Sequence, residues 1–253
     1  LPFFARIPLR TGWRGEARGW LLNDCRKLDK LRYPLMVQRF AALAFPADSA
    51  LPAQLPVPHL PADPDKTAVL LNKLGLTTQR PVLALCPGAE FGPSKQWPAQ
   101  QYAEVAAHYL QAGFQVWLLG SASDFVAGES IRERLDSQAQ RCDCVNLSGK
   151  TVLGDAVDLL AASTAVVSND SGLMHIAAAL GRPLVVVYGS TSPDFTPPLA
   201  DRVHTVSLQL PCSPCFKRQC PLGHLDCLKQ LPSTRVIDAL ADLLDQGVDK
   251  PLA

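Results

Sequence analysis

The chain has 253 residues, and its 24 Lys and Arg nearly balance its 23 Asp and Glu, so its formal charge is +1 at neutral pH. Scattered basic residues argue against a nucleic-acid partner, because binding a phosphate backbone through counterion release needs clustered Lys and Arg. This length suits one large or two small domains, and a hydrophobic content of 47% is enough to build a core. The composition excludes collagen-like, coiled-coil and disordered chains. Charges and prolines interrupt every apolar run short of roughly 18–20 residues, so we expect no transmembrane segment.

The N-terminal part of the chain begins Leu1-Pro2-Phe3-Phe4, with no Met and no basic leader, and continues into an Arg-rich loop. An amphipathic helix is expected over about 34–45, with no strand pair before it. We therefore expect residues 1–45 to be the C-terminal remnant of a domain whose front lies upstream of Leu1. Six prolines in 46–64 prevent helix propagation and favour extended backbone, which is typical of a linker.

Short apolar strands alternate with longer helical patterns from residue 65 onward. This alternation is typical of βαβ units that form a parallel sheet covered on both faces. We predict an α/β fold, with a doubly wound domain over 65–253 whose ligand binds beyond the carboxyl ends of the strands. The expected strands are 81–86, 114–119, 144–147, 164–168 and 183–188, and the expected helices are 65–76, 98–112, 124–138, 152–162 and 172–181.

The loop after the first of these strands reads C-P-G-A-E-F-G-P-S-K-Q-W-P and contains Gly88, Gly92 and Lys95. Its glycines allow close backbone approach. Lys95 places a positive charge just before a helix N-terminus, where an anion also meets free N–H groups, so a diphosphate fits the loop. The pattern is neither Walker A nor G-x-G-x-x-G, and a solvated turn with a surface lysine is an equally weighted alternative.

A second loop, S-N-D-S-G-L-M-H, follows strand 164–168. His175 lies four residues after Ser171, so both side chains share one helix face near its positive end. Because Asp170 repels phosphate, we assign it to sugar hydroxyls or to helix capping, and we assign the phosphates to the amides of Ser171 and Gly172. A capped helix start with a histidine in the core is the alternative.

Two further loops are rich in hydroxyl groups. Residues 188–198 look like a binding rim, and neither a G-x-S-x-G elbow nor a Ser-His-Asp arrangement points to a nucleophile. Residues 119–124 include Ser121 and Asp124, which would either meet a nucleoside ribose or cap the following helix.

Four of the eight cysteines cluster as C-x2-C-x4-C-x6-C. An intracellular enzyme keeps its thiols reduced, which favours a metal site over disulfides. Four thiolates could complete the tetrahedral shell of a structural zinc ion, with Lys217 and Arg218 offsetting its charge. An iron–sulfur centre, free thiols and bridges formed on oxidation stay open as alternatives. The candidate ligands are Cys212, Cys215, Cys220 and Cys227.

The motifs C-P-G-A-E-F-G-P-S-K-Q-W-P, S-N-D-S-G-L-M-H-I-A-A-A-L and Y-G-S-T-S-P-D-F-T-P-P-L, in this order, resemble the ADP-heptose:lipopolysaccharide heptosyltransferases of Gram-negative bacteria. The likeness is to the branch called heptosyltransferase II, and it covers essentially the whole chain. It implies a GT-B glycosyltransferase with two Rossmann-like domains, of which the C-terminal one binds most of the nucleotide-sugar. Residues 1–45 would then belong to the acceptor-side domain.

The resemblance also implies an activity, namely transfer of L-glycero-D-manno-heptose from ADP-heptose to the first heptose of the lipopolysaccharide inner core, with inversion. No cofactor would be required for catalysis. The enzyme would be cytoplasmic and peripheral to the inner membrane, where its acceptor lies. The donor-binding residues carried over are Gly88, Ala89, Glu90, Lys95, Ser121, Asp124, Asp170, Ser171, Gly172 and His175.

The general base implied by the resemblance is an Asp that would lie upstream of Leu1, so no catalytic residue is expected within the chain. Arg10, Arg14 and Arg18 would contact acceptor phosphates, unless they form a solvated basic loop.

Three other functions are open. Heptosyltransferase I or another ADP-heptose-dependent transferase is the nearest. A truncated module that binds nucleotide-sugar without turnover is a function of a different class. A dehydrogenase is third, and the missing G-x-G-x-x-G argues against it.

Overall fold

A computed structural model describes residues 2–246, which divide into two compact units. The first unit is the chain up to Pro56 with Pro193–Pro197, and the second is Val57–Ser192 with the chain from Pro198 on. The change from one unit to the other at Pro56 falls inside the proline-rich segment 46–64. Residues 1 and 247–253, which the expected domain ranges include, lie outside the described residues. Within the described part, none of the helices is both long and apolar enough to cross a bilayer.

The first unit contains a strand pair that the sequence analysis did not expect. Strand β1 (Thr11–Trp13) pairs in parallel with β2 (Asp24–Arg26), so the expectation of no strand pair was wrong. Each strand has only three residues, too few to show an alternating pattern. The short 3-10 helix η1 (Gly19–Leu21) lies between them, and the helix expected over 34–45 is α1 (Met36–Ala41) followed by the 3-10 helix η2 (Ala42–Ala44).

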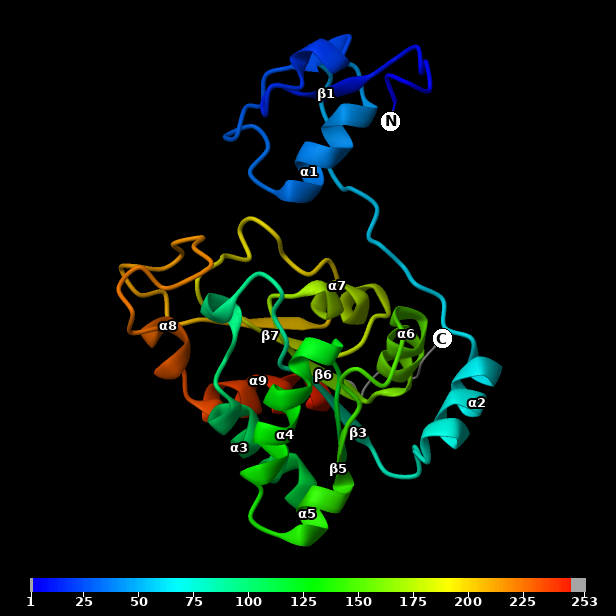
Figure 1. Ribbon diagram of the computed structural model, residues 1–253, viewed down its shortest axis with the longest axis vertical. Coiled ribbons are helices and arrows are strands. Elements are labelled where there is room, and N and C mark those ends of the chain that lie inside the picture. The colour runs from blue at the N-terminus through cyan, green and yellow to red at the C-terminus, as the bar shows by residue number, and fades with distance from the viewer. Residues whose placement is uncertain (1, 247–253) are drawn as a thin grey trace. The chain divides into compact units, whose positions relative to one another are not determined.

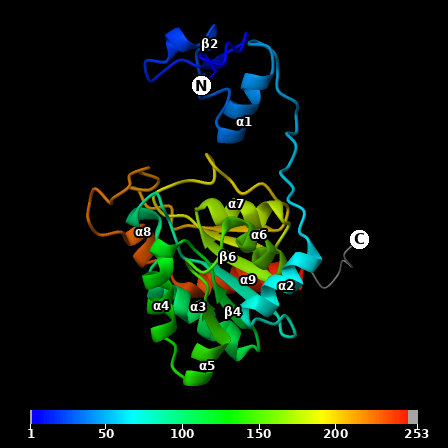
Figure 2. The same cartoon turned by 45° about the vertical axis from the view of Figure 1, so that its right-hand side comes forward.

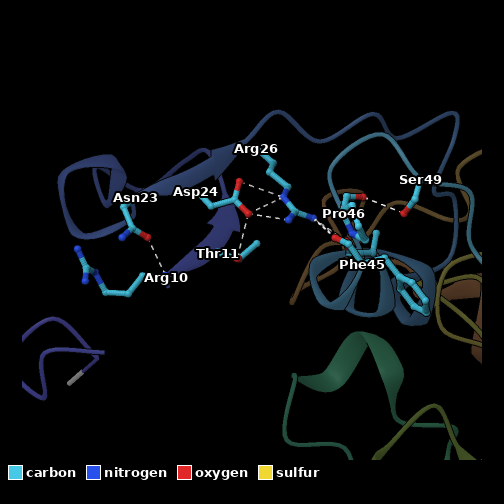
Figure 3. A network of polar contacts seen from close by, with 9 residues as sticks. Arg10, Thr11, Asn23, Asp24, Arg26, Phe45, Pro46 and Ser49 are labelled. Atoms are coloured by element: carbon cyan, nitrogen blue, oxygen red, sulfur yellow. Dashed lines mark hydrogen bonds and ion pairs between the residues drawn. The ribbon is translucent and has the colours of Figure 1, made fainter. Parts of the chain in front are cut away.

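An ion pair joins these elements, as Figure 3 shows. The Asp24 carboxylate accepts hydrogen bonds from Thr11 Oγ1 at 3.0 Å and from Arg26 Nη2 at 2.6 Å. Arg26 Nη1 donates to the carbonyls of Ala42 and Phe45 at 2.8 and 2.7 Å. The hydrogen bond from Arg26 is the main reason that the pKa of Asp24 lies below its ordinary value. The strand pair is thereby tied to carbonyls at the C-terminal end of the helical segment.

The second unit is built on a six-stranded parallel sheet (Figure 1). Its order is β5-β4-β3-β6-β7-β8, which is 3-2-1-4-5-6 when its strands are counted along the chain, the Rossmann order. All five expected strands are present, whereas β8 was not predicted because its sequence V-H-T-V is half polar. The strands are β3 (Val82–Cys86), β4 (Gln115–Leu118), β5 (Cys144–Asn146), β6 (Ala165–Asn169), β7 (Leu184–Val187) and β8 (Val203–Val206).

The helices of this unit agree with the sequence analysis except at three places. The helix expected over 124–138 ends at Glu133, and a separate helix that was not predicted begins at Gln138, where Ser137 accepts a hydrogen bond from the N–H of Gln140 at 3.1 Å as an N-cap. Helices α8 and α9 were not predicted. The helices are α2 (Pro64–Leu74), α3 (Ala99–Gln111), α4 (Phe125–Glu133), α5 (Gln138–Asp143), α6 (Leu153–Ala162), α7 (Gly172–Ala179), α8 (Asp226–Lys229) and α9 (Ser233–Asp245), with 3-10 turns η3 (Pro93–Lys95) and η4 (Ala122–Asp124).

Helices cover both faces of the sheet (Figure 2). In β3, Leu83 and Leu85 pack with residues of α3, α4 and α9, while Val82, Ala84 and Cys86 pack with residues of α2, α6 and α7. Burial on both faces explains why the strand is a continuous apolar run. In β3 no polar side chain interrupts that run.

A glycine in α4 supplies a test of this packing. A Cβ at Gly128 would lie 2.6 Å from Asn146 Nδ2, which donates to the Phe125 carbonyl at 3.0 Å and to Glu129 Oε1 at 2.9 Å and so cannot move freely. We expect Gly128→Ala to lower the free energy of unfolding by about 1–3 kcal/mol through overpacking.

The matched control is Gly154→Ala in α6, where a Cβ would meet no atom within 4 Å. It should be neutral or stabilising by up to ~1 kcal/mol, because alanine has the higher helix propensity. Urea unfolding of both variants measures the difference, and equal losses would contradict the packing described.

Candidate functional site

The site lies where the sheet changes direction. Strands β3 and β6 are neighbours, yet β3 leads into α3 on one face and β6 leads into α7 on the other. This divergence is the topological switch point at which ligands bind in doubly wound sheets. The loops after β3 and β6, which were singled out from the sequence, therefore meet at one edge.

A buried ion pair joins these two loops. Lys95 Nζ lies 2.7 Å from Asp170 Oδ2, and Thr191 Oγ1 donates to the same oxygen at 2.6 Å. Asp170 is 5% exposed and the Lys95 side chain 15%. Lys95 Nζ also lies 4.9 Å from the centre of the Phe91 ring. An ammonium group has three N–H donors, so Lys95 is held in place and still has donors for a ligand.

His175 lies on α7 near this pair. Its pKa is below the ordinary value, mainly through desolvation and partly through Lys95, while Asp170 opposes the shift. The imidazole is thus mainly neutral at pH 7 and can donate through one nitrogen and accept through the other. The structure places Lys95, Asp170 and His175 in one neighbourhood, as expected.

The first turn of α7 is not capped by a side chain. Ser171 is the N-cap residue, but its hydroxyl pairs with the Ser168 hydroxyl at 3.2 Å, and within the described range no side chain accepts a hydrogen bond from the first amides. The Asp170 carboxylate is paired with Lys95, so the capping role considered for it was wrong: the opposite charge on Lys95 binds it more strongly than a backbone N–H would. The amides from Gly172 onward stay available to an anion.

Asn169, which the sequence analysis did not assign to the site, fixes the loop after β3. Its Oδ1 accepts hydrogen bonds from the Trp97 N–H at 3.2 Å and from the Tyr102 hydroxyl at 3.1 Å, and its Nδ2 donates to the Pro87 carbonyl at 2.6 Å. Burial raises the pKa of Tyr102 well above its ordinary value, so its hydroxyl stays a donor. The sequence feature that could have identified Asn169 as part of the site is a polar amide at the end of an apolar strand.

The turn that begins at Gly88 lies against a second carboxylate. A Cβ at Gly88 would lie 2.5 Å from the Asp124 carboxylate, which explains the glycine. Asp124 Oδ2 accepts hydrogen bonds from the Ser121 N–H at 2.8 Å and from its hydroxyl at 2.7 Å, so these two residues cap η4. Ala89 is buried and Glu90 is exposed. The structure thus brings Gly88 and Asp124 together at the ends of β3 and β4.

The side chains of the N-terminal arginines differ in their hydrogen bonds and in their exposure. The Arg10 guanidinium donates to the carbonyls of Leu21 and Ile7 at 2.8 and 2.6 Å. Arg14 and Arg18 are exposed, and Arg18 lies 3.4 Å from Glu16. All of them belong to the first unit, in which Arg10 has a structural role.

Five cysteines lie in the second unit near these loops. Burial raises the pKa of Cys86, at the end of β3, to about 12, so it is no nucleophile. The four clustered cysteines are free thiols that line one pocket. Within residues 2–246, no group of three or more His, Cys, Asp or Glu is arranged to hold a metal ion. The expected ligands are therefore gathered, but they do not form an assembled metal shell.

A parallel sheet in Rossmann order, with a fixed cation and an uncapped helix N-terminus at its switch point, defines an α/β protein whose strand ends offer groups that can accept an anion. Comparison with known proteins agrees. The family model described as glycosyltransferase family 9 (heptosyltransferase) matches residues 1–226. The chain therefore belongs to glycosyltransferase family 9, the heptosyltransferase family.

Individual relatives are similar over most of the chain. Lipopolysaccharide heptosyltransferase 2 of Salmonella typhimurium is 46% identical, over 98% of this chain and 73% of the relative. Lipooligosaccharide heptosyltransferase 2 of Haemophilus influenzae is 50% identical, over 82% of this chain and 62% of the relative. The solved structure of E. coli ADP-heptose LPS heptosyltransferase II matches with a TM-score of 0.88 at 45% identity, over 98% of this chain and 73% of that one. The expected α/β fold of GT-B type is thus confirmed.

The Asn169 hydrogen bonds generate a testable expectation. Asn169→Ala leaves the Trp97 N–H and the Pro87 carbonyl without their side-chain partner, so it should lower the free energy of unfolding by about 1–3 kcal/mol. Asn72→Ala on the exposed face of α2 is the control and should change it by less than ~0.5 kcal/mol. Chemical denaturation measures both, and an Asn169 variant as stable as the control would contradict the assigned role.

Proposed function

We propose that the chain transfers L-glycero-D-manno-heptose from ADP-heptose to the first heptose of the lipopolysaccharide inner core. The observation that carries this proposal is the buried Lys95–Asp170 pair beside the uncapped start of α7. The pair occurs in a chain 46% and 50% identical to two proteins named heptosyltransferase 2. The reaction would take place at the cytoplasmic face of the inner membrane, with the protein bound peripherally.

Donor binding uses the groups at the switch point. The free N–H donors of Lys95 and the amides of Ser171 and Gly172 bind the diphosphate, and His175 donates a further hydrogen bond to the phosphates or the heptose. Asp170 orients Lys95, and Thr191 in turn fixes the Asp170 carboxylate. The turn Gly88-Ala89-Glu90 lines the donor pocket, with Ser121 and Asp124 beside the ribose.

Catalysis by these residues is electrostatic. As the bond between the anomeric carbon and the diphosphate oxygen breaks, negative charge grows on the leaving diphosphate. A cation and amides already held in place stabilise that charge without reorganising. An inverting transfer also needs a base for the acceptor hydroxyl. Arg14 and Arg18 are the proposed contacts to acceptor phosphates.

The direct test supplies the chain with ADP-heptose and core acceptors that carry no heptose or one heptose. Product formed only on the one-heptose acceptor supports the proposal. Product on the heptose-free acceptor points instead to heptosyltransferase I activity. ADP-heptose binding with no product on either acceptor shows a binding module without turnover, and it would overturn the proposed transfer by this chain.

Lys95→Ala tests donor binding. Loss of a charge-assisted contact worth about 1.5–3 kcal/mol should raise the Kd for ADP roughly 10-fold to 150-fold. Lys73→Ala, an exposed lysine on α2, is the charge-matched control and should leave the Kd unchanged. Isothermal titration calorimetry on folded samples measures both. An unchanged Kd in Lys95→Ala would remove Lys95 from the donor site.

A further inference from the structure

We propose that Cys212, Cys215, Cys220 and Cys227 form a four-thiolate site for one sulfur-preferring divalent ion, Zn²⁺ or Fe²⁺. The site lies in the irregular segment between β8 and α8, which carries no role in the proposed transfer. We call residues 207–225 with Cys227 the cysteine segment.

The four thiols share one small pocket. All four cysteines line one cavity of about 20 Å³, and Ser94 and Ser190 line it as well. A cavity of this size has room for about one water molecule or one ion. All four are half-buried, so they are sheltered from bulk solvent while a small ion can still reach them. Four cysteines that line space for one ion supply the donor set of a tetrahedral zinc or iron site.

The backbone turns tightly after Cys220. The Cys220 carbonyl accepts a hydrogen bond from the Gly223 N–H at 3.1 Å. Gly223 and Leu225 have φ values of 73° and 60°, in the left-handed region where the chain can make such a turn. Cys220 and Cys227, on either side of this turn, line the same cavity.

His224, which also lines the pocket, is a poorer ligand candidate. Its Nδ1 accepts a hydrogen bond from the Asp226 N–H at 2.9 Å, so this lone pair is already used. The ligands are therefore the four sulfurs. Four thiolates with a divalent ion carry a net charge of −2, and Lys217 and Arg218 in the same segment supply two positive charges.

A bound ion would order the cysteine segment, which has no secondary structure to do so. Between Val206 and Asp226 the chain forms no helix or strand, and so long an irregular stretch inside a compact domain calls for another source of order. In this structure the four thiols are unbridged and not grouped as ligands, so metal binding would require their sulfurs to turn toward the shared cavity.

Metal analysis tests the site on the chain as it exists. The protein is purified without chelators under reducing conditions, and its zinc and iron are measured by inductively coupled plasma mass spectrometry. We expect about one equivalent of zinc or iron per chain. Cys220→Ser and Cys227→Ser should each lose most of that metal, while Cys142→Ser, an exposed cysteine outside the segment, is the matched control and should keep it.

Cobalt substitution keeps the test decisive if a variant folds poorly. Metal-stripped wild-type chain titrated with Co²⁺ should develop the intense visible absorption of a tetrahedral cobalt thiolate, saturating at one equivalent. Less than half an equivalent of metal together with no cobalt band would overturn the proposal. Metal that survives in Cys220→Ser, or mass spectrometry showing disulfides among these cysteines in the reduced preparation, would overturn it as well. None of these readouts depends on donor binding, so they are independent of the proposed transfer.

Discussion

A carboxylate that is almost fully buried needs compensation, and this requirement links the fold of the second unit to its chemistry. Removing a charge from water costs several kcal/mol, and the contacts of Asp170 with Lys95 and Thr191 offset that cost. Lys95 is 75 residues before it in sequence and Thr191 is 21 residues after it. The interaction forms only when the loops after β3, β6 and β7 are all in place. The sheet order brings those loops together, and the ion pair then stabilises their arrangement.

The same pairing determines how the site attracts an anion. Asp170 neutralises Lys95 at close range, so the pair itself carries no net charge. Attraction of a diphosphate then depends on oriented donors, namely the remaining N–H groups of Lys95 and the amides at the start of α7. Oriented donors act over short distances. Such donors therefore favour a phosphate that lies in the correct position, and they contribute little to the long-range attraction of other anions.

Local sequence signals predicted most of the sheet, and they failed where the signal was weak. Apolar runs such as 82–86 predict buried strands because both faces of a parallel sheet are covered. The polar residues of β8 and the three-residue strands of the first unit give no such pattern. Helix α9 is a different case, since Val236, Leu240 and Leu243 follow helical spacing and could have been recognised.

The site was predictable in its parts but not in its pairing. Lys95 and Asp170 were singled out as loop residues at strand ends, since the carboxyl edge of a parallel sheet gathers such loops. Their partnership could not be read from residues so far apart in sequence. The role of Asn169 was hidden for the same reason, because its partners Trp97, Tyr102 and Pro87 come from the loop and helix after β3.

Ser94 connects the loop after β3 to the cysteine segment. This buried residue directly precedes Lys95; its hydroxyl donates to the Lys217 carbonyl and accepts a hydrogen bond from the Ser190 hydroxyl at 3.1 Å, and its N–H donates to the Arg218 carbonyl at 3.4 Å. A hydroxyl that donates once and accepts once fixes three chain segments relative to one another. Because the Phe216 N–H donates to the Ser190 carbonyl at 2.7 Å, the cysteine segment is bound to both neighbouring loops. Whatever orders that segment therefore also limits the movement of Lys95, the residue next to Ser94.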